Sequence, residues 1–123
     1  MTASQRSSFR TRSRWVGLAL VPVRRPADAV FTLGWNDTEF DTAGEISVIL
    51  RSWEDRLGAY IVSLAPGGMD LTIERPPQTT DDQWKWAVEQ LAFNKSGALM
   101  FDGPAGLVRI QAKFEDVVGF YWD

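Results

Sequence analysis

The most constraining feature of this sequence is an amphipathic helix whose two ends are both marked. Thr42 and Glu45 form a capping box, in which each side chain can bond the backbone N–H of the other residue. Apolar residues then recur at i, i+3, i+4, i+7 and i+11, which is one helical stripe: Ile46, Ile49, Leu50, Trp53 and Leu57. Gly58 suits a left-handed helix end. Such a stripe needs a second layer to cover it.

Two segments after this helix predict an antiparallel β-hairpin. Residues 59–64 are rich in side chains that favour strands, and residues 65–68 have the composition of a tight turn. Residues 69–73 alternate apolar and polar side chains, so we expect one buried and one wet face, with Asp70 on the wet one.

The N-terminal third of the chain predicts one further strand and one short helix. Residues 16–21 form a continuous apolar run of strand length, which indicates a central strand ended by Pro22. Pro26 is tolerated at a first helical position, so residues 27–33 are expected to be helical, and Gly34 to end that helix.

The C-terminal half predicts a second amphipathic helix and a closing strand. Thr80 and Gln83 read as its capping box, and the helix ends near Asn94. Its apolar residues are Trp84, Val88 and Leu91, with Ala87 and Ala92. Residues 98–101 suggest a brief strand and residues 117–122 a closing one. Residues 107–114 fit a strand by alternation and a helix by their apolar spacing.

These elements predict an α+β fold. We expect a two-layer sandwich in β-α-α-β-β-α-α-β order, with a mainly antiparallel sheet of about four strands and helices on one face. The 123 residues suffice for one domain, which we place at residues 15–123. Residues 1–14 are rich in Ser, Thr and Arg and are expected to form a disordered basic tail.

The charge of the chain is unevenly distributed. Residues 1–27 contain six arginines and no acid, a net charge of +6, whereas residues 28–123 sum to −9. An acidic body opposes nucleic-acid binding, except weakly through the basic tail. No segment approaches the roughly 20 apolar residues that cross a bilayer, so we expect no membrane partner and a cytoplasmic location.

The residue types that are missing limit the chemistry. The sequence has no His and no Cys, which excludes the usual catalytic triads, thiolate nucleophiles and the common zinc sites. The glycines at 67–68 and 103–106 lack the pattern of a phosphate-binding loop. We therefore expect no catalytic residue, no metal and no cofactor. The leading interpretation is a non-catalytic protein-interaction module, of which an immunity- or antitoxin-like role is one form. A carboxylate-based hydrolase and a small-molecule-binding module are the alternatives.

Charged candidates for a binding site gather on the first long helix. Arg51, Glu54 and Asp55 could form a charged surface for a protein partner, or supply acid–base carboxylates. A solvated helix face with local ion pairs, such as Arg51 with Asp55, is the simpler interpretation. Arg75 is held extended by Pro76 and could reach a carboxylate of the long helix or anchor a ligand.

Two tryptophans and one acidic residue complete the candidate binding residues. Trp35 and Trp86 could be interface anchors or lids over the margin of the sheet. Trp84 and Trp86 lie about 200° apart on a helix, so at least one of them should face outward. Asp37 begins an acidic run that extends to Glu45, but the spacing lacks the central glycine of a calcium loop.

Six short motifs in the same order carry a resemblance to a known family. They are Arg25-Pro26-Ala27-Asp28, Leu33-Gly34-Trp35, the segment 51–59, Arg75-Pro76-Pro77, Ala92-Phe93 and the segment 120–123. With them the chain resembles, over roughly residues 17–123, a bacterial domain-of-unknown-function family, number 4253. The resemblance implies a compact α/β domain without an assigned role, and a helix at residues 105–114.

The chain departs from this family at two places. The family usually has a His, and four residues later a Cys, around the end of the second long helix. The corresponding positions here look like Gln90 and Asn94. The family also tends to have Gly-Pro after the Gly-Trp element, where Asn36 and Asp37 stand here. An activity that depended on the His and Cys would be absent from this chain.

Overall fold

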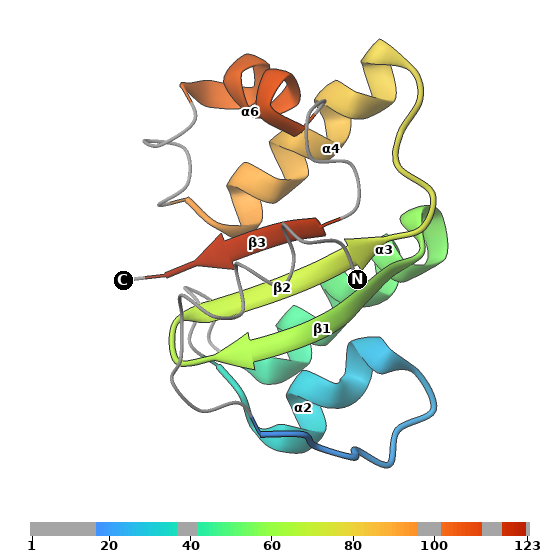
Figure 1. The fold of residues 1–123 in the computed structure, drawn as a ribbon, viewed down its shortest axis with the longest axis vertical. Helices are drawn as coiled ribbons and strands as arrows, with labels where there is room; N and C mark the ends of the chain where they lie inside the picture. Colours follow the sequence, from blue (N-terminus) through green and yellow to red (C-terminus); the bar gives the residue numbers. More distant parts are fainter. Residues whose placement is uncertain (1–16, 37–41, 96–101, 112–116, 123) are drawn as a thin grey trace.

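The structure is a computed structural model that describes residues 17–36, 42–95, 102–111 and 117–122 (Figure 1). The helical elements are η1 (Pro26–Asp28), α2 (Ala29–Leu33), α3 (Ala43–Leu57), α4 (Thr80–Phe93) and α6 (Gly103–Gln111), and the strands are β1 (Ala59–Ala65), β2 (Gly68–Ile73) and β3 (Val117–Tyr121).

The described strands form one antiparallel sheet in the order β1-β2-β3. Leu71 at its centre lies opposite Ile61 on one side and Val118 on the other. The hairpin turns at Gly67, where φ is +67°, and a Cβ there would lie 2.6 Å from the carbonyl oxygen of Trp122. The Trp122 N–H donates to the Gly67 carbonyl at 2.8 Å. The turn therefore requires glycine both for its backbone conformation and for this close approach.

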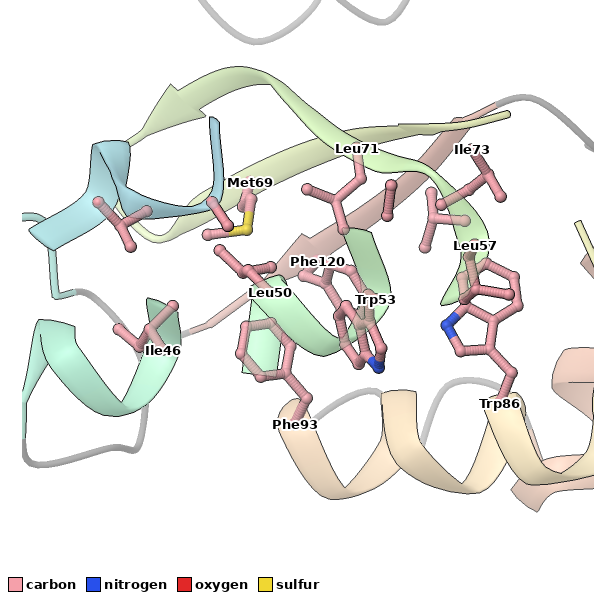
Figure 2. Packing of buried hydrophobic residues seen from close by; sticks show 14 of the residues in the cluster. Ile46, Leu50, Trp53, Leu57, Met69, Leu71, Ile73, Trp86, Phe93 and Phe120 are labelled. Atoms are coloured by element: carbon pink, nitrogen blue, oxygen red, sulfur yellow. The ribbon is translucent and has the colours of Figure 1, made fainter. Parts of the chain in front are cut away.

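Helices α3 and α4 lie on the same side of the sheet and close an aromatic core over it (Figure 2). Trp53 of α3 is 1% exposed and stacks on Phe120 of β3, with the ring centroids 5.6 Å apart. Phe93 of α4 meets the Trp53 ring edge-on at 5.0 Å. Three elements from distant parts of the sequence therefore contribute rings to one contact.

Both ends of α3 are as predicted. The Thr42 side chain accepts a hydrogen bond from the Glu45 N–H at 3.2 Å, and Gly58 ends the helix with φ of +60°. The prediction for α4 is wrong by one residue at its start, because Thr79 is the cap and accepts from the Asp82 N–H at 3.1 Å.

The predicted apolar face of α4 is wrong for Trp84 and Val88, although Ala87 is buried as expected. The helix buries Trp86, Ala87, Gln90 and Phe93, whereas Trp84 and Val88 are 48% and 44% exposed. The buried face includes the polar Gln90, so a search for apolar spacing does not identify that face.

The prediction for Asp70 of β2 is wrong. Asp70 was expected on a solvent-exposed face of the sheet, but it is 3% exposed and accepts a hydrogen bond from the Ser63 hydroxyl at 3.0 Å.

The strand expected at residues 16–21 is not formed over its described part. Residues 17–21 have no regular secondary structure, and Leu18 and Leu20 are 96% and 94% exposed. The free edge of β1 is covered instead by η1 and by Trp35, whose indole N–H donates to the Ala65 carbonyl at 3.1 Å. An apolar run alone does not reveal whether a sheet edge is open to receive it.

Most of the remaining fold predictions are confirmed. The α+β class, the hairpin, the short helix before Gly34 and the closing strand are confirmed. Three antiparallel strands, rather than about four, are present within the described ranges. The ambiguous segment is helical over its described part, which belongs to α6 and ends at Gln111, in keeping with the family resemblance. The proposed tail at 1–14 and the brief strand at 98–101 lie outside the described residues. Among the helices that the structure describes, none has the length and apolar character needed to span a bilayer.

Candidate functional site

The charged residues predicted on α3 belong to a cluster that joins this helix to η1 (the arginine–carboxylate cluster). The cluster comprises Arg25, Asp28, Arg51, Glu54 and Asp55. The Arg25 Nε donates to Glu54 Oε1 at 3.1 Å, while its Nη2 bonds Asp55 Oδ1. One guanidinium thus bridges two neighbouring carboxylates that helix geometry alone places about 100° apart.

The Glu54 carboxylate has a partner at each oxygen. Oε1 accepts from Arg25, and Oε2 accepts from the Ala27 backbone N–H at 3.0 Å. The side chain of Glu54 is only 13% exposed. Because its lone pairs are engaged by a charged donor and a backbone donor, Glu54 fixes η1 against the C-terminal part of α3.

Arg51 and Asp28 form a second connection between η1 and α3 in the cluster. The Arg51 Nε and Nη2 donate to the two carboxylate oxygens of Asp28 at 2.6 and 2.8 Å, a bidentate pair. The hydrogen bonds from Arg51 hold the pKa of Asp28 below its usual value, and they raise the pKa of Arg51. The predicted local pairing of Arg51 with Asp55 gives way to these longer-range partners.

Arg75 reaches the long helix, as expected, but it bonds the backbone of that helix. Its Nη2 donates to the carbonyl oxygens of Glu54 and Asp55 at 3.5 and 3.2 Å. These carbonyls lie in the last turn of α3, where a positive charge is favourable. The predicted ion pair with an acid of α3 is therefore wrong, and Arg75 stabilises the C-terminal end of the helix.

The arginine–carboxylate cluster is poorly suited to acid–base catalysis. A general acid needs a carboxyl group whose pKa is raised, whereas the pKa of Asp28 is lowered. Both oxygens of Asp28 and of Glu54 already accept hydrogen bonds. Within the described part of the chain, no group of three acidic side chains is placed to hold a metal ion.

The two tryptophan candidates, Trp35 and Trp86, differ in how deeply they are buried. Trp35 is half-buried at the edge of β1 and meets Trp122 edge-on, with ring centroids 5.8 Å apart, so it is a lid over the margin of the sheet. Trp86 is 6% exposed and belongs to the core, so its proposal as an interface anchor is wrong. Its neighbour Trp84 takes the outward position. Asp37 lies outside the described residues.

The outward face of α4 carries an exposed apolar strip that continues onto α6 (the α4–α6 strip: Trp84, Val88, Leu91 and Ile110). Trp84 and Val88 are one helical turn apart, so they share a face. Ile110 is 40% exposed, and Leu91 lines a shallow pocket with it between the two helices. Trp84, Val88 and Ile110 are exposed and Leu91 is half-buried, so the strip presents apolar side chains from both helices.

Gln90 and Asn94, where the resemblance implied a family His and Cys, are buried and hydrogen-bonded in this chain. Gln90 is 2% exposed and exchanges two hydrogen bonds with Gln111 of α6, which connects the two helices. Asn94 is 6% exposed, and its Nδ2 donates to the Tyr121 carbonyl at 2.9 Å. These carboxamides hold α6 and β3 to α4, and a role for them was not predicted from the sequence.

A groove runs beside the arginine–carboxylate cluster, between the segment before η1, α2 and α3 (the α2–α3 groove). Its volume is about 410 Å³. Apolar side chains line it together with charged and hydroxyl groups: Pro22, Val23, Arg24, Asp28, Phe31, Thr32, Gly44, Ser47, Val48 and Arg51.

Two members of the arginine–carboxylate cluster, Arg25 and Asp28, were not predicted as site residues from the sequence, although the motif at 25–28 was among those that carried the resemblance.

The architecture is therefore that of a small α+β domain in which helices cover one face of an antiparallel sheet. The chain belongs to the family described as Domain of unknown function (DUF4253), which matches residues 17–123. The family resemblance stated from the sequence motifs is thus confirmed. No curated protein and no solved structure gives a significant match to the chain.

Two of the family-like motifs meet in the fold. The motif at residues 25–28 contributes Arg25 and Asp28, and the motif at residues 51–59 contributes Arg51 and Glu54. Their crossed ion pairs form most of the arginine–carboxylate cluster. These motifs therefore have a structural basis, which is the attachment of η1 to α3.

Proposed function

We propose that this domain is a non-catalytic interaction module that binds a protein partner through the α4–α6 strip. The observation that carries the proposal is the outward Trp84, which is 48% exposed with Val88 one turn away. Tryptophan is among the residues that contribute most binding energy when a partner covers them. A single exposed apolar side chain is ordinary on a protein surface, whereas a continuous strip across two helices is a better candidate for an interface.

Charge at the start of α4 supports a basic partner. Asp81 and Asp82 occupy the first turn, are exposed, and form no ion pair with any residue in the described ranges. Lys85 is the cation nearest to them in the helix sequence, so the turn keeps a net negative charge. A basic rim around an apolar pocket on the partner would complement this surface.

An immunity- or antitoxin-like role is the specific form that we favour, in the cytoplasm. Residues 28–123 carry a net charge of −9, which would steer the domain toward a basic toxin. The hydrolase alternative finds less support, because the carboxylates of the arginine–carboxylate cluster are engaged by arginines and by a backbone N–H.

Photo-crosslinking in the native host tests the surface directly. A p-benzoylphenylalanine at position 88 should capture one partner in stoichiometric amount, whereas the same probe at Val62 should not. Val62 is a matched control because it is 43% exposed on β1, away from the α4–α6 strip.

A second variant separates binding from folding. Trp84→Ala should weaken capture by about tenfold or more, since it removes the proposed anchor. The free energy of unfolding of this variant should change by less than about 1 kcal/mol, as expected for a surface substitution. Equal capture by both probes, or undiminished capture by the Trp84→Ala protein, would contradict the proposal.

A further inference from the structure

The α2–α3 groove combines an apolar wall with uncommitted positive charge. Phe31 of α2 and Val48 of α3 line it and are each 66% exposed. Its volume of about 410 Å³ lies within the usual range of ligand pockets, roughly 300–1,000 Å³. Side chains so exposed on either side of a hollow are available to a ligand without any rearrangement of the core.

Arg24 is the first source of positive charge in the groove. The residue is exposed and forms no ion pair with the residues that the structure describes. Its neighbour Arg25 is directed to Glu54 and Asp55 instead. Arg24 therefore keeps its guanidinium donors for a ligand, while Arg25 holds the segment in place.

Arg51 is the second source. A guanidinium has five N–H donors, and Arg51 uses only Nε and Nη2 on Asp28. Its side chain is 50% exposed and lines the groove. The bidentate pair fixes the orientation of the guanidinium, so that the remaining donors are held at the groove at little entropic cost.

The charge balance of the groove favours an anion. Asp28 is its one carboxylate among the lining residues, and both of its oxygens are occupied by Arg51. Two guanidinium groups against one paired carboxylate leave a net positive charge on this hollow, although residues 28–123 are acidic as a whole. Guanidinium groups match the planar geometry of a carboxylate.

We propose that the α2–α3 groove binds a small monocarboxylate with an apolar body, with Arg24 and Arg51 at the carboxylate and Phe31 and Val48 along the body. This site is separate from the α4–α6 strip, and the proposal for it does not depend on the proposed protein interaction. Neither charge alone nor an apolar chain alone meets both halves of the groove.

Titration of the full chain with octanoate, followed by ¹H–¹⁵N NMR, tests this site. We expect saturable binding with a Kd on the order of 1 mM, in keeping with the modest affinity of ligands of this size. The shifts should centre on the backbone amides of Thr32, Gly44 and Ser47. Acetate, which lacks the chain, and 1-octanol, which lacks the charge, should each bind at least about threefold more weakly.

Two variants and two controls complete the test. Arg24→Gln should weaken octanoate binding about threefold or more, as expected for the loss of an exposed charge contact. Val48→Glu should abolish binding by placing a carboxylate in the groove. Arg109→Gln on α6 and Val62→Glu on β1 should leave binding unchanged. Octanol binding as tightly as octanoate, shifts that centre elsewhere, no saturable binding, or an unaffected Arg24→Gln protein would each overturn the proposal.

Discussion

Arg51 of α3 and Asp28 of η1 are 23 residues apart in the sequence and form a bidentate ion pair, with N–O distances of 2.6 and 2.8 Å. Arg25 makes the reciprocal connection to Glu54 of α3 at 3.1 Å. The two pairs join residues three positions apart in one segment to residues three positions apart in α3. This crossed arrangement determines where the segment lies, and it therefore sets one wall of the α2–α3 groove.

Acid titration of stability tests the Arg51–Asp28 pair. The pair lowers the pKa of Asp28 in the folded protein, so the ionised carboxylate stabilises the fold. This stabilisation is complete above the pKa of the unfolded chain, about 3.9, and is lost as the pH falls through the lower folded value. Asp28→Asn should therefore reduce the loss of unfolding free energy that the wild-type protein shows below about pH 4.

The partner variant supplies the control for this titration. Arg51→Gln should flatten the same part of the pH profile, whereas Arg109→Gln on α6 should retain the wild-type profile. Urea unfolding at a series of pH values measures all four proteins. An Asp28→Asn protein that follows the wild-type profile would show that the pair does not stabilise the fold.

Trp53 and Trp84 should respond very differently to truncation. Trp53 is 1% exposed and contacts the rings of Phe93 and Phe120, so Trp53→Ala should cost about 3–5 kcal/mol of unfolding free energy. Trp84→Ala should cost less than about 1 kcal/mol, because the side chain is 48% exposed. Chemical denaturation of the two variants measures the difference, and equal costs would refute this assignment of core and surface.

Gly67 should be harder to replace than Gly34, although both have positive φ. Alanine in a left-handed conformation costs roughly 1–2 kcal/mol at either position. At Gly67 the added Cβ would also lie 2.6 Å from the Trp122 carbonyl oxygen, whereas at Gly34 no atom lies within 4 Å. The thermal unfolding midpoint of Gly67→Ala should therefore fall further than that of Gly34→Ala. Matching midpoints would mean that the close approach adds nothing.

The Gln90–Gln111 pair should show strong coupling between its two members. Gln111→Leu leaves the buried Gln90 carboxamide without this partner, which should cost about 1–3 kcal/mol. The double variant Gln90→Leu, Gln111→Leu removes both polar groups and should recover most of that loss. A double-mutant cycle by urea unfolding measures the coupling. Additive losses would indicate that the two amides act independently.

Local features of the fold were predictable from the sequence where each residue agreed with its neighbours. The capping box at Thr42, the stripe ending at Leu57 and the turn at Gly67 all indicate the same arrangement, and the structure confirms it. Helix α4 offered two competing faces. The correct one contains Gln90, whose burial depends on Gln111 in another helix, and a hydrophobic pattern cannot reveal such a partner.

The candidate site was less predictable, because its contacts are not local. Arg51 and Glu54 were identified by their charge, but their partners Asp28 and Arg25 lie 23 and 29 residues away. Spacing along a helix indicates only neighbours within one or two turns. The sequence predicted that at least one of Trp84 and Trp86 faces outward, but it did not show which, because Trp84 also fits the apolar spacing of the helix.

The position of β3 at the C-terminal end of the described fold affects when the domain can fold during its synthesis. The β1–β2 hairpin can form as soon as its own residues are available, but Phe120 enters the aromatic core from a strand that pairs with β2 about 50 residues downstream. Until residues 117–122 have been synthesised, Trp53 and Phe93 lack the ring that completes their packing. The nascent domain should therefore complete its aromatic core only after residues 117–122 have become available to pair with β2.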